Sequence, residues 1–590
     1  MPLVSSLAQE TVPDLMTARQ YENAGDWQRA CDVYLTLVSR FPENDEYFFH
    51  CLELCSKIQR FDQAIELINQ KKRVKPNDIH LDVLAAQMVH RSGKVREAQQ
   101  MWDRILEAHP QDEWVVVLVA NAQAENGILK QAVETYLNAR RRMRKPYAFC
   151  LNLALLYETG FQYENAAAEW MKHLEIHPDQ IPLVESHLAR YPALERVVRG
   201  VDGLIRKAAE SHPRNAEYLG LLIRYETRFG LFGEAFETAL LIEEGNREKQ
   251  RGDALFRFAQ GAFQAGGLEP AQKAYEFFLK RFPSFRQLDM VLFNLSRCYA
   301  GSERYLESVG VLDELIRRFP QSRLAANALL EKGLLERDPL RRPDQAASTF
   351  QKLLDEYSLS RECDRVRFEL IDCYILQNDL HQARIHCQQT VRLASSMDRS
   401  IRVKADFYLS ELDFFMGDFI RASSRLDSLF RTHFGVEETQ DPVLNDALSL
   451  SMLSKILAKA DSEGRSIFAG GMLAMRQKRI DQAVKAFDRI VKTPAAYPSL
   501  VAEALYQNGL ALLAVSRYPD GIVCFKRLLE DYPGHIHAER ALERLGYAQE
   551  KSGEIQNALK TYEAFIETFP RSVLSDEVRK RIRKMDEGSS

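Results

Sequence analysis

The feature that constrains the fold most is an internal repeat with a fixed period of 34 residues. Each repeat contains an alanine that follows the previous one by 34 residues: Ala30, Ala64, Ala98, Ala132 and Ala166. Four residues after each alanine comes a large side chain, namely Tyr34, Ile68, Trp102, Tyr136 and Trp170. A strict period of this length indicates an array of small supersecondary units rather than several independent globular domains.

The pattern within each repeat predicts two helices joined by a tight turn. Apolar residues recur at spacings of three and four, as on one face of a helix. Glycine precedes the alanine by five residues at Gly25, Gly93 and Gly127, where it lets the first helix end. Proline ends the second helix at Pro42, Pro76, Pro110 and Pro178. Small residues also occupy the facing positions of the first helix, Ala18, Ala86, Ala120 and Ala154. We therefore expect the two helices to approach closely and the large residue to fill the gap to the next repeat.

A second array continues the pattern with a longer step. The key positions are Ala235, Ala271, Ser308, Ala346, Ala383, Ala422, Ala483, Gly521 and Ala558. Most steps are 36 to 39 residues, longer by about one helical turn. The facing small residues are Ala259, Ser296, Ser410, Gly471, Gly509 and Gly546, whereas Leu334 is one residue away from Gly333. One step of 61 residues, from Ala422 to Ala483, predicts an inserted loop and an additional helix, placed on a working face or used only for packing.

These positions and the 34-residue period resemble the tetratricopeptide repeat family, over residues 11–178. Tyr21 and Tyr157 match the aromatic residue on the first helix in that family. The longer repeats resemble those of bacterial cell-envelope proteins such as outer-membrane assembly lipoproteins. The resemblance implies an all-α, right-handed superhelical solenoid of about 14–15 helix pairs. It also implies that the first helix of each pair lines a concave face that holds an extended peptide or a helix.

The predicted organisation follows from where the repeats begin, weaken and stop. It comprises a flexible start or signal-peptide remnant (1–10), the 34-residue array (11–178), a degenerate repeat or junction (179–230), the longer-period array (231–434), a loop with an extra helix (435–464), a further array (465–570) and a capping helix with its tail (571–590).

Composition and missing motifs exclude several classes of function. The chain has 79 basic and 83 acidic residues and a net charge of −4, which argues against nucleic-acid binding by bulk charge. The sequence contains no run of 18 consecutive apolar residues, so it predicts no membrane-spanning helix. The phosphate-loop, dinucleotide-binding, zinc-protease and nucleophile-elbow motifs are absent from the sequence. We therefore expect neither catalysis nor a cofactor.

The cysteines are odd in number and scattered, so they do not predict a disulfide framework. They are Cys31, Cys51, Cys55, Cys150, Cys298, Cys363, Cys373, Cys387 and Cys524. Cys51 and Cys55 are one helical turn apart and could serve a metal, but no second pair and no suitably spaced histidine completes a tetrahedral site. The prediction is free thiols packed as small apolar side chains, without a metal, which favours a reducing compartment.

The first residues leave the compartment open. Ser6-Leu7-Ala8 has the small-x-small pattern of a signal-peptidase site, which is consistent with the tail of a signal peptide and hence the periplasm or cell envelope. The other interpretation is a frayed terminus on a cytoplasmic protein.

The candidate binding residues are those that the family resemblance places on the first helices of the first array. They are Arg19, Glu22, Glu53, His90, Arg91, Trp114, Asn121, Glu125, Asn152 and Glu158. Asn121 and Asn152 fit the family's asparagines that hold a ligand backbone or carboxylate, but Val117 replaces the accompanying lysine. A carboxylate clamp is therefore not favoured. Trp114 either anchors a partner side chain or packs between repeats.

The function predicted from these features is a non-catalytic scaffold or adaptor that binds partner proteins or peptides. Three alternatives stay open at this point. The chain could be a structural subunit of a bacterial envelope or secretion assembly, the regulatory subunit of an enzyme complex, or a protein with a catalytic site within 435–470. A monomer is expected, with self-association left open.

Overall fold

The computed structural model describes six stretches of the chain, within which every regular element is a helix. They are residues 14–212, 215–245, 252–393, 399–433, 442–493 and 497–588. The predicted flexible start (1–10) and the loop part of the predicted insertion (435–441) lie outside them. The chain divides into two compact halves, Met1–Phe285 and Arg286–Ser590. Within the described part, none of the helices has both the length and the apolar character needed to cross a membrane.

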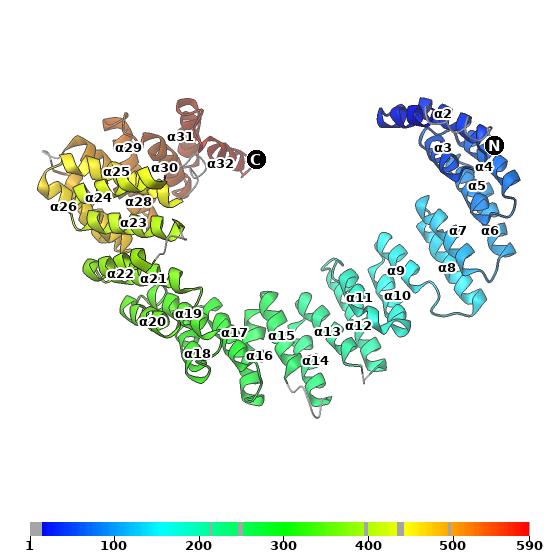
Figure 1. Ribbon diagram of the computed structural model, residues 1–590, viewed down its shortest axis with the longest axis horizontal. Coiled ribbons are helices and arrows are strands. Elements are labelled where there is room, and N and C mark those ends of the chain that lie inside the picture. Colours follow the sequence, from blue (N-terminus) through cyan, green and yellow to red (C-terminus); the bar gives the residue numbers. More distant parts are fainter. Residues whose placement is uncertain are drawn as a thin grey trace, which may run out of the picture. The chain divides into compact units, whose positions relative to one another are not determined.

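The first half is a succession of helices in which neighbours along the chain pack side by side (Figure 1). A helix over residues 14–23 is followed by α2 (Trp27–Arg40), α3 (Asp45–Lys57), α4 (Phe61–Val74), α5 (Ile79–Arg91), α6 (Val95–Ala108), α7 (Glu113–Glu125), α8 (Leu129–Met143), α9 (Cys150–Thr159), α10 (Tyr163–Ile176), the 3₁₀ turn η1 (Pro178–Gln180), α11 (Ile181–Leu188), α12 (Glu195–Ser211), α13 (Ala216–Arg228), α14 (Phe232–Gly245), α15 (Asp253–Gln264) and α16 (Leu268–Arg281).

The second half continues the same pattern of paired helices. It contains α17 (Leu288–Gly301), α18 (Tyr305–Arg318), α19 (Ala325–Arg337), α20 (Pro343–Glu356), α21 (Cys363–Leu376), α22 (Leu380–Leu393), α23 (Arg399–Phe415), α24 (Phe419–His433), α25 (Pro442–Lys459), α26 (Ser462–Arg476), α27 (Ile480–Val491), α28 (Pro498–Ala514), α29 (Tyr518–Asp531), α30 (Ala538–Lys551), α31 (Ile555–Thr568) and α32 (Ser575–Gly588). The expected all-α solenoid of helix pairs is therefore confirmed.

The turn within each pair has the backbone conformation that its glycine predicts. Gly25, Gly93 and Gly127 have φ angles of 75°, 90° and 77°, a left-handed region in which side chains with a Cβ are strained. Where a repeat lacks this glycine, Gln59 and Phe161 adopt the same conformation at φ 60° and 56°. The turn geometry is thus common to the repeats even where the sequence signal is missing.

The two helices of a pair are held together by a small residue under an aromatic ring. A Cβ atom built on Gly509 of α28 would lie 2.6 Å from the ring of Phe525 in α29, and one built on Gly546 would lie 2.5 Å from Tyr562. The large residue therefore covers the small residue of its own pair. In α19 it is Gly333 that lies under such a ring.

The insertion in the second half brings residues far apart in sequence into contact. Helix α25 packs against α24 and α23, with Leu450 and Leu457 buried in the shared core. After it, the end of α26 returns to α21, where Gln477 Nε2 donates to the Ile375 carbonyl oxygen at 2.8 Å. Array neighbours normally contact only the adjacent pair. The extra helix packs within the array, and the end of α26 contacts α21 past the intervening pair.

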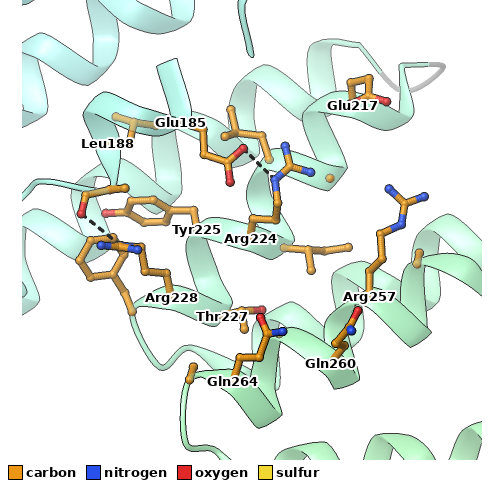
Figure 2. Close-up of a pocket in the computed structure, with 18 of the residues that line it drawn as sticks. Glu185, Leu188, Glu217, Arg224, Tyr225, Thr227, Arg228, Arg257, Gln260 and Gln264 are labelled. Carbon is orange, nitrogen blue, oxygen red and sulfur yellow. Dashed lines mark hydrogen bonds and ion pairs between the residues drawn. The ribbon is translucent and has the colours of Figure 1, made fainter. Parts of the chain in front are cut away.

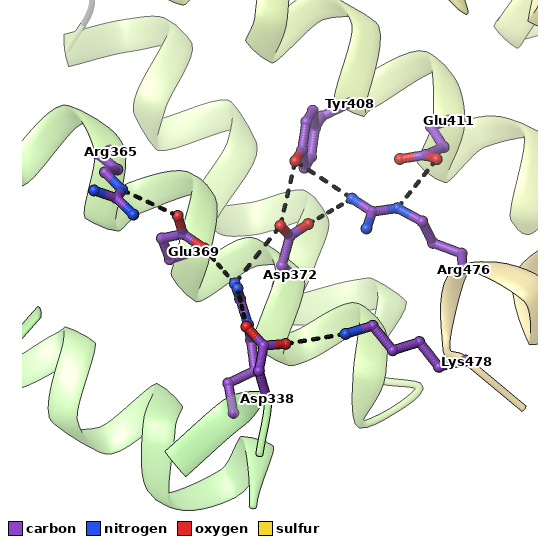
Figure 3. A network of polar contacts seen from close by, with 9 residues as sticks. Asp338, Arg365, Glu369, Asp372, Tyr408, Glu411, Arg476 and Lys478 are labelled. Carbon is purple, nitrogen blue, oxygen red and sulfur yellow. Dashed lines mark hydrogen bonds and ion pairs between the residues drawn. The ribbon is translucent and has the colours of Figure 1, made fainter. Parts of the chain in front are cut away.

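A polar network fixes this return contact (Figure 3). Arg476 of α26 donates to Asp372 of α21 at 2.6 Å and lies 3.3 Å from Glu411 of α23, while Lys478 pairs with Asp338 at 3.1 Å. Burial raises the pKa of both Glu411 and Asp372, and the guanidinium of Arg476 opposes that rise. The network therefore depends on the cation of Arg476 and on that of Arg337, which lies 3.9 Å from Asp372.

The small-residue contact predicts that a glycine-to-alanine substitution destabilises the chain at one site and stabilises it at another. Gly509→Ala places a Cβ against the Phe525 ring, and we expect destabilisation by about 1–3 kcal/mol. Gly310→Ala in α18, where a Cβ would meet no atom within 4 Å, should instead gain up to about 1 kcal/mol from helix propensity. Urea denaturation followed by circular dichroism measures both. Equal effects at the two sites would contradict the packing described here.

Removal of the Arg476 cation from the network should make the free energy of unfolding depend on pH. Arg476→Met leaves Asp372 and Glu411 without their shared counter-charge, so we expect a loss of about 2 kcal/mol at about pH 8, between the values for exposed and buried pairs. Because acids with raised pKa values hold protons more tightly in the folded chain, the deficit should shrink as the pH falls toward about 5.

The matched control for this prediction is Arg465→Met, which removes an arginine of the same helix. The Arg465 side chain makes no polar contact with any described residue, so its loss should change little at either pH. A deficit in Arg476→Met that is the same at both pH values would show that the carboxyl groups do not titrate as their burial requires.

Candidate partner-binding site

A cavity with a volume of about 1020 Å³ lies in the first half. Three helices wall it: the short α11, α13 and α15 (Figure 2). It opens where the array is irregular, because α12 packs directly between α10 and α13, and the short α11 lies against the same two helices. The departure from regular pairing thus leaves room that a regular repeat would fill.

The floor of the cavity is apolar and rigid. Leu188, Tyr191, Leu221 and Tyr225 line it, and all four side chains are buried in the core of the first half. Burial raises the pKa of both tyrosines, so their hydroxyl groups stay neutral. The Tyr225 hydroxyl donates to the Val198 carbonyl oxygen at 3.4 Å, which holds its ring against the floor.

Two glycines leave the space above this floor. Gly220 of α13 and Gly261 of α15 both line the cavity. A Cβ atom on Gly220 would lie 3.1 Å from the guanidinium of Arg224, and one on Gly261 would lie 3.2 Å from the methyl group of Thr227. Any larger side chain at either position would therefore project into the cavity.

Three arginines at the rim differ in how they are held (Figure 2). Arg224 Nε donates to Glu185 at 2.9 Å, and Arg228 Nε donates to the Ala189 carbonyl oxygen at 3.1 Å. Arg257 of α15 is exposed and makes no polar contact with the rest of the described chain. It is the arginine whose charge is left for another molecule.

Sequence reasoning did not select this cavity, which lies in and beside the predicted junction 179–230. The available signal was the spacing of Gly220, Arg224 and Arg228, because residues four apart share one helix face. The recurring alanine and large residue that define the repeats could not indicate the cavity, since its space depends on where α12 packs rather than on the residues of α13.

Two of the predicted groove residues are held by the chain's own aromatic side chains. Glu22 accepts a hydrogen bond from the Tyr34 hydroxyl at 3.3 Å. Glu158 accepts from Trp170 Nε1 at 2.9 Å and from the Tyr191 hydroxyl at 2.8 Å, and it also contacts His187 Nδ1 at 2.9 Å. Each glutamate is twelve residues before an aromatic residue of its own repeat, so it links the two helices of that pair.

Six further predicted residues contact neighbouring helices. Their partners are Glu46 at 3.1 Å for Arg19, the Trp102 ring for His90, Ser56 at 2.6 Å and Asn126 at 2.9 Å for Arg91, Tyr136 at 3.2 Å for Asn121, Gln87 at 3.0 Å for Glu125 and Tyr136 for Asn152. Asn121 and Asn152 thus both contact the Tyr136 hydroxyl group. Burial raises the pKa of Tyr136 to about 12, while its hydrogen bond with Asn152 lowers it.

The remaining two predicted residues are open to solvent. Trp114 at the start of α7 is 56% exposed, and Glu53 of α3 is also exposed. Neither side chain has a polar partner within the described ranges, although the backbone N–H of Trp114 donates to Asp112. These two are the members of the predicted set with the most surface free for a partner.

Family models described as "Tetratricopeptide repeat" match four segments of the chain. One matches residues 14–44 and 540–572, and a second matches 256–323 and 340–398. The matched segments lie near both ends and across the middle of the chain. They include the start of the 34-residue array and parts of the longer-period repeats.

Curated relatives match only a short segment. The chain is 35% identical over 68 residues to the outer membrane protein assembly factor BamD of Xylella fastidiosa strain 9a5c, and 34% identical to that of strain Temecula1. These alignments cover 12% of this chain and 23% of each relative. The chain thus spans about a quarter of the length of the curated relatives it matches.

Solved structures resemble the chain at low identity. The structure of Naa15/Naa10 bound to HypK-THB covers 98% of this chain and 89% of its own, at 12% identity and a TM-score of 0.33. A tetratricopeptide repeat protein from Parabacteroides merdae covers 48% and 99%, at 16% identity and a TM-score of 0.24. The yeast Sti1 TPR2AB-domain:pHSP90-complex covers 44% and 98%, at 16% identity and 0.19.

The contacts of Glu158 predict that its removal lowers the free energy of unfolding, rather than only altering the surface. Glu158→Ala removes the acceptor for the Trp170 and Tyr191 donors, so we expect a loss of about 2 kcal/mol. Glu53→Ala, which changes an exposed glutamate of another first helix, should stay within about 0.5 kcal/mol of the parent. Urea denaturation measures both, and an unchanged midpoint for Glu158→Ala would contradict the assigned role.

Proposed function

The chain is a tetratricopeptide repeat protein, and from that premise we propose that it is a non-catalytic scaffold that binds a segment of a partner protein in the cavity of α11, α13 and α15. Repeats of this kind support protein interaction in general. The observation that carries the specific proposal is the preformed cavity of about 1020 Å³ with an apolar floor and a charged rim. Sites for bound molecules combine these two properties.

A preformed cavity favours binding because little of the protein must be ordered. The floor tyrosines are buried, and Arg224 and Arg228 are already fixed by Glu185 and the Ala189 carbonyl. Binding therefore costs mainly the ordering of the partner segment. The volume suits a few side chains of an extended peptide or one face of a helix.

The rim suggests the chemistry of the partner. Arg224 is neutralised by Glu185. Asp253 lies one turn before Arg257 on α15 but forms no ion pair with it, and Glu217 lies near the start of α13. A partner carboxylate would meet the charge of Arg257 while an adjacent apolar side chain covers the floor. The proposed ligand is therefore a segment with an acidic residue beside large apolar ones.

Other modes of interaction remain proposals for other parts of the chain. Trp114 and Glu53 could contact a partner along the first array, where they are exposed. A structural role in an envelope assembly is favoured by the partial likeness to outer membrane protein assembly factors. Cross-linking that finds partners along both arrays, rather than around α13, would favour that role over a single peptide site.

The experiment is to close the cavity without disturbing the fold. Peptides selected by display on the full chain should bind it and share the acidic and apolar pattern. Gly220→Leu projects into the cavity and should weaken their binding by about tenfold or more, as should Arg257→Ala. Isothermal titration calorimetry measures the affinities.

The matched control is Gly203→Leu in α12, an exposed helical glycine where a Cβ would meet no atom within 4 Å. It should bind the selected peptides as the parent does. Equal affinity for the parent and Gly220→Leu, or failure of the full chain to select any peptide, would overturn the proposal.

A further inference from the structure

Three buried cysteines from two helices meet at one point in the first half. Cys31 lies on α2, and Cys51 and Cys55 lie one turn apart on α3. Their three sulfur atoms lie within 4.8 Å of one another, and the sulfurs of Cys31 and Cys55 are 3.2 Å apart. All three side chains have 0% exposure. The chain therefore holds a compact set of three sulfur ligands.

The expectation of free, packed thiols holds, because all nine cysteines are free and eight are buried. The sequence pattern pointed only to Cys51 and Cys55. Cys31 joins them because the residue after the key alanine of one repeat packs against the first helix of the next. No other cluster of three such ligands occurs within the ranges that the structure describes.

The spacing of the sulfurs suits a metal ion. An ion about 2.3 Å from each of three thiolates would place the sulfurs roughly 4 Å apart. The present separations span this value, from 3.2 Å to an upper limit of 4.8 Å, so only small side-chain shifts are needed. The surroundings are apolar, with Tyr34, Phe48 and Ile68 in the same core cluster.

The number and type of ligands select the ion. In the described part of the chain, no histidine or carboxylate completes the set as a fourth ligand. Structural zinc requires four ligands, whereas soft thiolates without nitrogen or oxygen partners suit monovalent copper. We propose that Cys31, Cys51 and Cys55 form a three-sulfur site for a soft, thiophilic metal ion, with Cu(I) as the ion that fits best.

The local charges favour binding. The guanidinium of Arg60 lies near the cluster, where its charge offsets that of thiolate ligands. Arg60 is itself fixed by Asp32 at 2.6 Å. Because the metal binds the thiolate form of cysteine, coordination by the three sulfurs releases their protons to solvent.

The test is anaerobic titration of the reduced full chain with Cu(I) in the presence of a competing Cu(I) chelator. We expect one tightly held ion per chain, and X-ray absorption should show three sulfur neighbours at about 2.3 Å. Proton release on binding, followed with a pH indicator, should accompany the uptake.

The variants Cys55→Ala and Cys55→Ser should weaken binding by more than about a hundredfold, the upper end of what loss of an outer-shell partner costs. Cys298→Ala, which changes a buried cysteine of the second half, is the matched control and should bind like the parent. Circular dichroism identifies any variant that fails to fold.

Three results would overturn the site. These are no chelator-resistant Cu(I) on the parent chain, two rather than three sulfur neighbours in the absorption spectrum, or equal binding by Cys298→Ala and a folded Cys55 variant. Because the parent spectrum alone decides the coordination number, the proposal stays testable even if both Cys55 variants unfold.

Discussion

The fold depends on one contact that recurs along the chain: a small residue of one helix lies under a large side chain of the next. Gly509 under Phe525 and Gly546 under Tyr562 show how little room this contact leaves. Because each pair is closed by its own small residue and ring, the array needs no central core. Each pair is stabilised by itself and its neighbours, as expected for a repeat protein.

The proposed binding site lies where this regular packing is interrupted. In the first half, α12 packs between α10 and α13, and the short α11 leaves the faces of α13 and α15 uncovered. The resulting cavity combines an apolar floor with the unpaired charge of Arg257. In the second half, the interruption has the opposite effect, because α25 adds core and lets Arg476 join α26 to α21 and α23.

The sequence allowed much of the architecture to be predicted, because the repeat key is local. Ala30 and its equivalents, with turn glycines such as Gly25, identify the helix pairs and their order. The contacts between pairs were harder to predict. Glu158 fits the family's groove position by sequence, yet its oxygens are used by Trp170 and Tyr191, a residue of the next segment.

The cavity and the cysteine cluster could not be predicted for a related reason. Gly220 and Arg257 share a cavity only because of where α12 lies, and Cys31 reaches Cys55 only across the boundary of two repeats. Neither pair of residues is separated by a fixed distance along the sequence that the repeat period would reveal. A search that pairs the residue after each key alanine with the next first helix would have found the cysteine cluster.

The central claim is that the irregular segment, rather than the regular first array, holds the partner. Hydrogen–deuterium exchange of the full chain with and without a selected peptide tests it directly. The account predicts slower exchange in α11, α13 and α15 on binding, with α3, α5, α7 and α9 unchanged. Protection confined to those first-array helices, with none in α13 or α15, would contradict it.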